Sequence, residues 1–314
     1  MWKVVSRVAR PAPALSIRGG SCSSIPPTYF RTDCFGGSVG SRRAFAGFTS
    51  WDDGMIWYPN RAELEKAEGF SESSVIVAKG YLTEKVKKST GEFQQVKKYS
   101  FFDNYDEFAK KTAETDVNPY HEVLPKGKPR CLYFDIDGKP VFKKLHDQIV
   151  GAMQHLVYWF FFRDRGDVSA DQIIPVVMTT DSPNKYSCHL VFPQIQFKDQ
   201  IEQNTYLSTF FKCLNSIQDD FSFLPRLVDK QPYGVFQCFR GPRACKVDCM
   251  LEDAPLKEDS ALIPQEFFNG DELTGFIGYV NPAYKISLEP LEQIVEQSDF
   301  KKAHHCEYIE RSSP

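Results

Sequence analysis

The stretch "CLYFDIDGKP" at residues 131–140 decides the fold and the chemistry expected of this chain. Apolar residues run up to Asp135, which is the pattern of a buried strand. Side chains two apart on a strand share a face, so Asp135 and Asp137 point to one side while Phe134 and Ile136 point into the core. Neighbouring carboxylates repel unless a cation lies between them, and hard oxygen ligands suit Mg²⁺ or Mn²⁺. The stretch predicts a metal-binding strand end; an ordinary Asp-Gly turn is the structural alternative.

A second candidate strand, "KYSCHLVF" at residues 185–192, carries polar side chains at alternate positions. Lys185, Ser187 and His189 therefore share one face of this strand. A cation, a hydroxyl and an imidazole in a row can hold a triphosphate, because each donates hydrogen bonds to phosphate oxygens. The solvated face of an antiparallel strand has the same alternation, so this stretch alone leaves both interpretations open.

A third stretch, "LVDKQPYGVFQCFRGPRACK" at residues 227–246, places an acid behind two apolar residues and ends in a basic cluster. Asp229 is a third candidate metal ligand. Arg240, Arg243 and Lys246 are candidate partners for phosphates. Taken singly, the stretch also fits an acidic turn residue followed by a surface basic cluster.

Read together, the three stretches resemble the three motifs of the primase-polymerase branch of the archaeo-eukaryotic primase superfamily. Their order is a carboxylate pair, a Lys-x-Ser-x-His strand, and an Asp followed by an Arg eleven residues later. The resemblance includes "PYHEVLPKGKPRCLYFDID" and the Asp181 that precedes the second motif. It extends from Asp103 to Val247, about half of the chain.

This resemblance implies a role for each motif residue. It assigns metal binding to Asp135, Asp137 and Asp229, and binding of the incoming nucleotide's phosphates to Lys185, Ser187, His189, Arg240 and Lys246. It implies an RRM-like catalytic sheet next to a small N-terminal α/β module. The implied reaction is in-line attack of a 3′-hydroxyl on the α-phosphate of a nucleoside triphosphate, with two divalent metals.

Two departures from the family pattern bear on activity. Asp137 stands where some relatives have Glu, and a shorter carboxylate bears on the preference between Mg²⁺ and Mn²⁺. The zinc module that many relatives carry after the core, and which is associated with starting chains, has no evident counterpart. Six cysteines and histidines after the third motif's Asp fit no standard zinc spacing and are interpreted as buried thiols and a polar tail: Cys238, Cys245, Cys249, His304, His305 and Cys306. We therefore expect clear primer extension and weak priming.

The hydrophobic pattern predicts an α+β fold, with helices packed mainly on one face of a sheet. Segments 73–82 and 93–102 are expected to be strands that a Lys-rich turn joins as a hairpin. The other expected strands are 130–136, 173–179, 185–192, 233–240 and a short one ending at Asp229. The expected helices are 103–114, capped by Asp103, and 142–162, 198–217 and 287–297. The predicted domains are a leader at 1–50, an α/β module at 51–118, the catalytic core at 119–255 and an extension at 256–314.

The first fifty residues differ in charge from the rest of the chain. They hold seven basic residues and one acid, whereas the whole chain has a net charge of −3. An Arg-rich, Ser-rich and acid-poor leader is typical of a mitochondrial transit peptide. Plastid transit peptides share this composition, and a basic arm that binds nucleic acid in the nucleus is the other alternative. Because the remainder is acidic, any contact with nucleic acid must be local.

Composition limits the class of protein. With 314 residues, 42% of them hydrophobic, the chain can bury a sizeable core. Its longest apolar run, residues 155–162, is far shorter than the roughly 20 residues that cross a bilayer, so no membrane partner is expected. The nine cysteines lack the spacing of a disulfide scaffold.

Three functions fit these observations. The first is a template-dependent DNA polymerase, with primase activity left open, in organellar replication or damage tolerance. Its partners would be a single-stranded DNA template, a primer, nucleoside triphosphates, and a single-strand binding protein or helicase. The second is a non-catalytic single-strand binding accessory protein, against which the intact acids argue. The third is a metal-dependent nuclease, which leaves the Lys-Ser-His strand unexplained.

Overall fold

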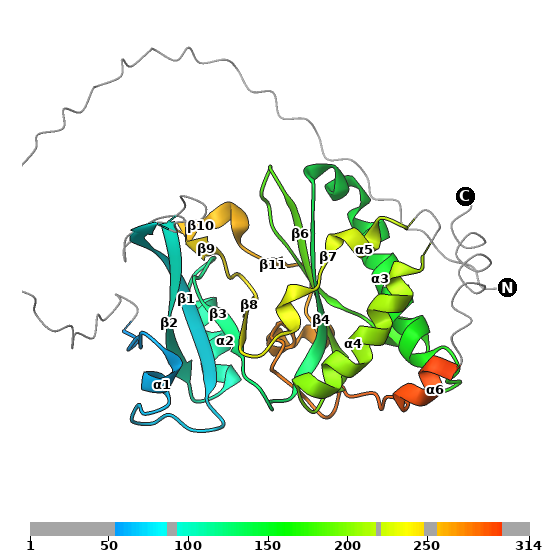
Figure 1. The fold of residues 1–314 in the computed structure, drawn as a ribbon, viewed down its shortest axis with the longest axis horizontal. Coiled ribbons are helices and arrows are strands. Elements are labelled where there is room, and N and C mark those ends of the chain that lie inside the picture. The colour runs from blue at the N-terminus through cyan, green and yellow to red at the C-terminus, as the bar shows by residue number, and fades with distance from the viewer. Residues whose placement is uncertain (1–53, 87–92, 218–220, 248–255, 297–314) are drawn as a thin grey trace, which may run out of the picture. The chain divides into compact units, whose positions relative to one another are not determined.

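The computed structural model describes residues 54–86, 93–217, 221–247 and 256–296 of the chain. The predicted leader lies outside these residues, as do Cys249 and the His304–Cys306 group. The fold is mixed α+β, as predicted, and contains two larger antiparallel sheets and one two-stranded sheet (Figure 1). No helix in the described part of the chain is both long and apolar enough to cross a membrane.

The helices and strands follow one another without regular alternation. In chain order they are α1 (Arg61–Leu64), β1 (Val75–Val86), β2 (Phe93–Phe102), α2 (Tyr105–Ala113), β3 (His121–Leu124), β4 (Arg130–Gly138), α3 (His146–Phe162), β5 (Val176–Thr179), β6 (Tyr186–Phe197), α4 (Gln200–Asn215), α5 (Leu224–Leu227), β7 (Val228–Asp229), β8 (Gln237–Arg240), β9 (Lys246–Val247), β10 (Leu256–Lys257), β11 (Ile263–Pro264) and α6 (Leu291–Glu296).

The first sheet has four strands in the order β2-β1-β3-β8. Strands β1 and β2 pair antiparallel, so the predicted pairing of these two segments is confirmed. Strand β3 was not predicted from the sequence; it joins β1 to β8, with His121 opposite Arg240. The sheet thus combines strands from the segment predicted as an N-terminal module with strands from the segment predicted as the core.

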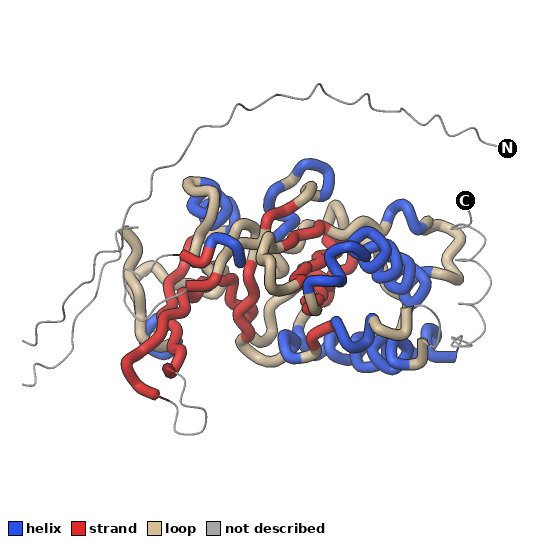
Figure 2. The backbone as a smooth tube through the Cα atoms, turned by 90° about the horizontal axis from the view of Figure 1, so that it is seen from above, coloured by secondary structure: helices blue, strands red, loops and turns tan. Residues whose placement is uncertain are grey.

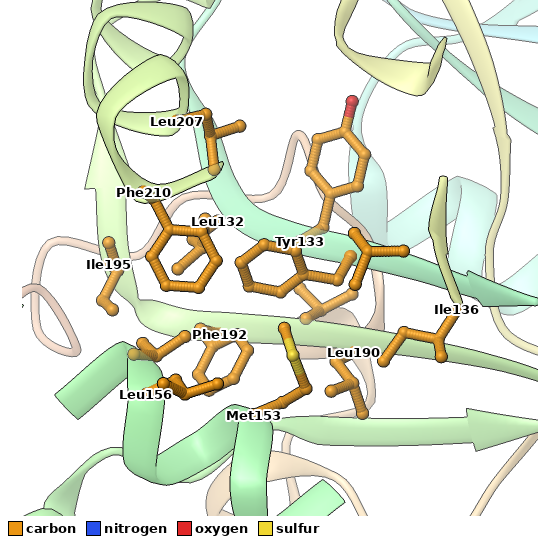
Figure 3. Close-up of a cluster of buried hydrophobic side chains, with 14 of the residues drawn as sticks. Leu132, Tyr133, Ile136, Met153, Leu156, Leu190, Phe192, Ile195, Leu207 and Phe210 are labelled. Atoms are coloured by element: carbon orange, nitrogen blue, oxygen red, sulfur yellow. The ribbon is translucent and has the colours of Figure 1, made fainter. Parts of the chain in front are cut away.

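The second sheet has five strands in the order β11-β5-β6-β4-β7. Leu132 and Ile136 on β4 face the apolar side chains of α3 and α4, such as Met153 and Phe210 (Figure 3). Phe134 packs on Phe210 with ring centroids 5.3 Å apart. Both helices cover this one face, and the strands of the second sheet lie between them and the β1–β2 hairpin (Figures 1 and 2). The predicted alternation on β4 therefore leaves its acids on the face turned away from the helices.

Some predicted boundaries were wrong. The long helix expected from Phe142 begins at His146, because a 3₁₀ turn at Pro140–Leu145 precedes it, as is common at helix N-termini. The cap of α2 is Asn104 and not Asp103, since the Asn104 side chain accepts the Glu107 amide at 2.9 Å.

A buried carboxylate on the first sheet is hydrogen-bonded to a later segment of the chain, at residues 277–278. Glu122 on β3 is fully buried and accepts three hydrogen bonds: from the Tyr105 hydroxyl at 2.6 Å, from the Ile277 amide at 2.9 Å and from the Gly278 amide at 2.8 Å. Burial raises the pKa of Glu122, and the three donors oppose this rise. These bonds hold β3, α2 and the segment around Gly278 together.

We expect Gly278→Ala to unfold the protein at a markedly lower temperature. A Cβ at this position would overlap the Tyr105 hydroxyl and lie 2.9 Å from Glu122 Oε1, so the hydrogen bond between them cannot survive. Loss of a hydrogen-bond donor to a buried carboxylate lowers the free energy of unfolding by about 1–3 kcal/mol or more. Thermal unfolding would measure the effect. Gly166→Ala is the control, because nothing lies within 4 Å of a Cβ there; equal melting temperatures for the two variants would contradict this account.

Candidate metal and nucleotide site

The register of three strands places the predicted acids beside one another. On β4, Asp135 lies opposite Asp229 of β7 on one side and opposite His189 of β6 on the other. Asp137 lies opposite Ser187. Directly opposed residues of antiparallel strands share a face, so all five side chains lie on the face that the helices leave uncovered. Segments far apart in the sequence therefore meet in one place.

Two predicted phosphate-binding residues contact the acids directly. The Lys185 ammonium lies 2.6 Å from Asp137 Oδ2, and His189 Nε2 lies 3.3 Å from Asp135 Oδ1. The second contact is an ion-pair distance without hydrogen-bond alignment, since neither atom has a hydrogen-bond partner. The cationic row and the acidic row thus partly neutralise each other.

His189 is held in one orientation. It is 2% exposed, its ring packs on Phe239 with centroids 4.2 Å apart, and its Nδ1 lies 3.2 Å from the backbone oxygen of Arg240. A carbonyl oxygen only accepts hydrogen bonds, so Nδ1 carries the hydrogen. Nε2 is then the atom turned to Asp135, and it donates there only in the imidazolium form.

Arg240 and Lys246 are positioned by a later segment of the chain. The Arg240 guanidinium donates to the backbone oxygen of Ser260 at 2.5 Å, and the Lys246 amide donates to the Ser260 hydroxyl at 2.8 Å. Burial lowers the pKa of Arg240, although the charges of Asp135 and Asp137 raise it in part. No signal in the sequence pointed to this role of Ser260, which comes from the predicted C-terminal extension.

The charges around Asp135 keep it ionised. Burial on its own would raise the pKa of Asp135, but the charges of His189, Arg240 and Lys185 outweigh burial and the pKa is lowered. The pKa of Lys246 is lowered by partial burial and by the neighbouring cations Arg240 and Lys185. These mutual effects indicate that the predicted residues share one electrostatic environment.

The acids do not converge on a common point. Asp229 Oδ1 accepts the Gln231 amide at 2.9 Å in its own turn, while Asp135 and Asp137 face their cationic neighbours. Within residues 54–86, 93–217, 221–247 and 256–296, no three His, Cys, Asp or Glu side chains form a metal-ligand cluster. The backbone brings the three acids together, and rotation of their side chains would be needed to close a cation site.

The polar atoms of this face nevertheless fit a divalent cation. Asp135 Oδ1 and Asp137 Oδ1 are both buried and have no hydrogen-bond partner. Ser187 Oγ and His189 Nε2 on the neighbouring strand are in the same condition. Buried polar atoms are normally satisfied, and a buried carboxylate oxygen that accepts no hydrogen bond destabilises the folded state. Carboxylate oxygens of this kind are ligands that Mg²⁺ and Mn²⁺ prefer.

Arg243 does not join the site. Its backbone has a positive φ of 60°, and it is held by hydrogen bonds from its amide to Leu262 and from the Asn118 amide to its own carbonyl. The residue lines a small cavity with Phe267 and Phe276. Among the described residues, no contact links its guanidinium to the acids.

The chain matches no protein-family model and no curated protein sequence. The interpretation of the site therefore depends on the three motifs and their geometry.

Proposed function

We propose that this protein is a template-dependent nucleotidyltransferase that extends a DNA primer with two divalent metals. The observation that carries the proposal is the pair of buried carboxylate oxygens without a hydrogen-bond partner, Asp135 Oδ1 and Asp137 Oδ1, beside Lys185 and His189. The two acids lie on β4, and His189 lies opposite Asp135 on the adjacent β6, with Lys185 directly before that strand. A nucleotide bound with its metals presents complementary charges in the same order.

Each residue would have a distinct task. Asp135, Asp137 and Asp229 would hold Mg²⁺ or Mn²⁺, which when bound would activate the attacking 3′-hydroxyl and neutralise charge on the leaving pyrophosphate. Ser187 and His189 on β6, and Lys185 directly before this strand, would donate to the phosphates. Arg240 and Lys246, which both hydrogen-bond to Ser260, would add further positive charge next to the phosphates. The protein then positions charge and supplies no nucleophile.

The contacts within the site suggest that ligands exchange partners as they bind. Lys185 and His189 lie against the two carboxylates that a cation would occupy. A bound cation would replace Lys185 and His189 as the partner of both carboxylates. The two side chains would then be available to bind the phosphates. Metal and nucleotide would then each increase the affinity for the other. The metal displaces Lys185 and His189 from the acids, and the nucleotide draws the same two side chains away from the acids.

The family resemblance adds finer expectations to this proposal. The five-stranded sheet with α3 and α4 on one face would correspond to the RRM-like catalytic sheet. In the cell, the enzyme would act in organellar DNA replication or damage tolerance, on single-stranded template with a helicase or single-strand binding protein. A fluorescent fusion of residues 1–50 would test the mitochondrial address against plastid and nuclear ones.

One assay separates the candidate functions. The protein would be incubated with a primed template, labelled deoxynucleotides and Mg²⁺ or Mn²⁺, beside a double variant with Asp135→Ala and Asp137→Ala. Extension by the wild type alone supports the proposal. Shortening of the primer would instead indicate a nuclease, and binding without turnover an accessory protein. On unprimed template, we expect only weak synthesis with either ribo- or deoxynucleotides.

A further inference from the structure

The row of unsatisfied polar atoms continues onto a strand that the motifs do not include. Met178 and Thr179 of β5 lie opposite His189 and Cys188 of β6. The same register brings Thr180 opposite Ser187, and the Thr180 amide donates to the Ser187 carbonyl at 3.1 Å. Opposed residues share a face, so the Thr180 side chain lies on the same side as Ser187 and Asp137.

Three buried oxygens without a hydrogen-bond partner thus follow one another across the sheet: Thr180 Oγ1 directly after β5, Ser187 Oγ on β6 and Asp137 Oδ1 on β4. Other threonines in the chain behave differently. Thr112, Thr205 and Thr274 each donate to a nearby backbone carbonyl. An unpaired buried hydroxyl destabilises the folded state, so its presence beside the acids needs an explanation, and a ligand that accepts from it is one.

We infer that the Thr180 hydroxyl is a further ligand-binding group, which together with Ser187 and Lys185 donates to phosphate oxygens of a bound nucleoside triphosphate. This inference depends on the proposed function. Lys185 directly precedes β6 and its ammonium contacts Asp137, the residue opposite Ser187, so the ammonium and the two hydroxyls form one set of donors. Hydroxyls suit this task because they can rotate to meet an oxyanion.

The test uses Thr180→Val, which removes the hydroxyl and keeps the branched shape. Titration calorimetry would measure binding of a non-hydrolysable nucleoside triphosphate with Mg²⁺ to the full chain. We expect about tenfold weaker binding, the loss of one hydrogen bond to a charged oxygen. Without ligand, the variant should melt at the same or a higher temperature, because an unsatisfied buried hydroxyl has been removed.

Two further variants make the result specific. Thr180→Ser keeps the hydroxyl and should bind within about twofold of the wild type. Thr179→Val removes the same group from the opposite face of the chain and should also bind within about twofold. Wild-type affinity in Thr180→Val, or equal weakening in Thr180→Val and Thr180→Ser, would overturn the role of the hydroxyl while leaving the proposed function intact. Absence of nucleotide binding by the wild type would overturn both.

Discussion

Asp229→Asn is expected to lower primer extension by about 1000-fold or more while leaving the melting temperature unchanged. Asp229 lies opposite Asp135, so its negative charge is needed if the two acids share a cation. The amide of Asn can still accept the Gln231 backbone amide through its oxygen, as Asp229 Oδ1 does at 2.9 Å. The substitution therefore removes the charge and retains the turn.

Single-turnover extension on a primed template would give the rate, and thermal unfolding the stability. Asp171→Asn is a matched control, because Asp171 is an exposed acid in the 3₁₀ turn Ala170–Gln172, outside the site. Extension by Asp229→Asn at a rate near that of Asp171→Asn would show that Asp229 is not a metal ligand.

Lys185→Met is expected to change two affinities in opposite directions. Loss of the ammonium should weaken nucleotide binding by about 10- to 100-fold, because a charged donor to phosphate is lost. It should also tighten Mn²⁺ binding in the absence of nucleotide, because Asp137 loses the cation 2.6 Å from its Oδ2. This second effect should be only about two- to fivefold, since both partners are partly exposed to solvent.

Paramagnetic resonance of free Mn²⁺ would measure the metal affinity, and calorimetry the nucleotide affinity. Lys198→Met is the control, because Lys198 is an exposed lysine beyond the far end of β6. If Lys185→Met weakened the binding of both ligands or of neither, the proposed exchange of partners between Lys185 and the cation would be wrong.

The sequence predicted the side-chain arrangement correctly where polar and apolar residues alternate along one strand. The two-residue period of a strand is enough to place Asp135 beside Asp137, and Lys185 beside Ser187 and His189. It also predicted the β1–β2 pairing, because the two apolar runs are separated by a polar turn. These features depend on local spacing alone.

Other features depend on register and were not predictable. Which residue at the end of β5 lies opposite Ser187 is set by strand pairing, so Thr180, directly after β5, could not be distinguished from Thr179 in the sequence. Ser260 contacts Arg240 and Lys246 only because the chain returns to the site after an intervening segment. Strand β3 was missed because four residues carry too short a pattern, and its place between β1 and β8 comes from tertiary pairing.

The most direct test of the central claim is anomalous diffraction from crystals of the protein soaked with Mn²⁺ and a non-hydrolysable nucleoside triphosphate. The account predicts manganese peaks between the carboxylates of Asp135, Asp137 and Asp229, with the phosphates against Lys185 and His189. A well-occupied nucleotide with no manganese at these three acids, or manganese bound only elsewhere, would contradict it.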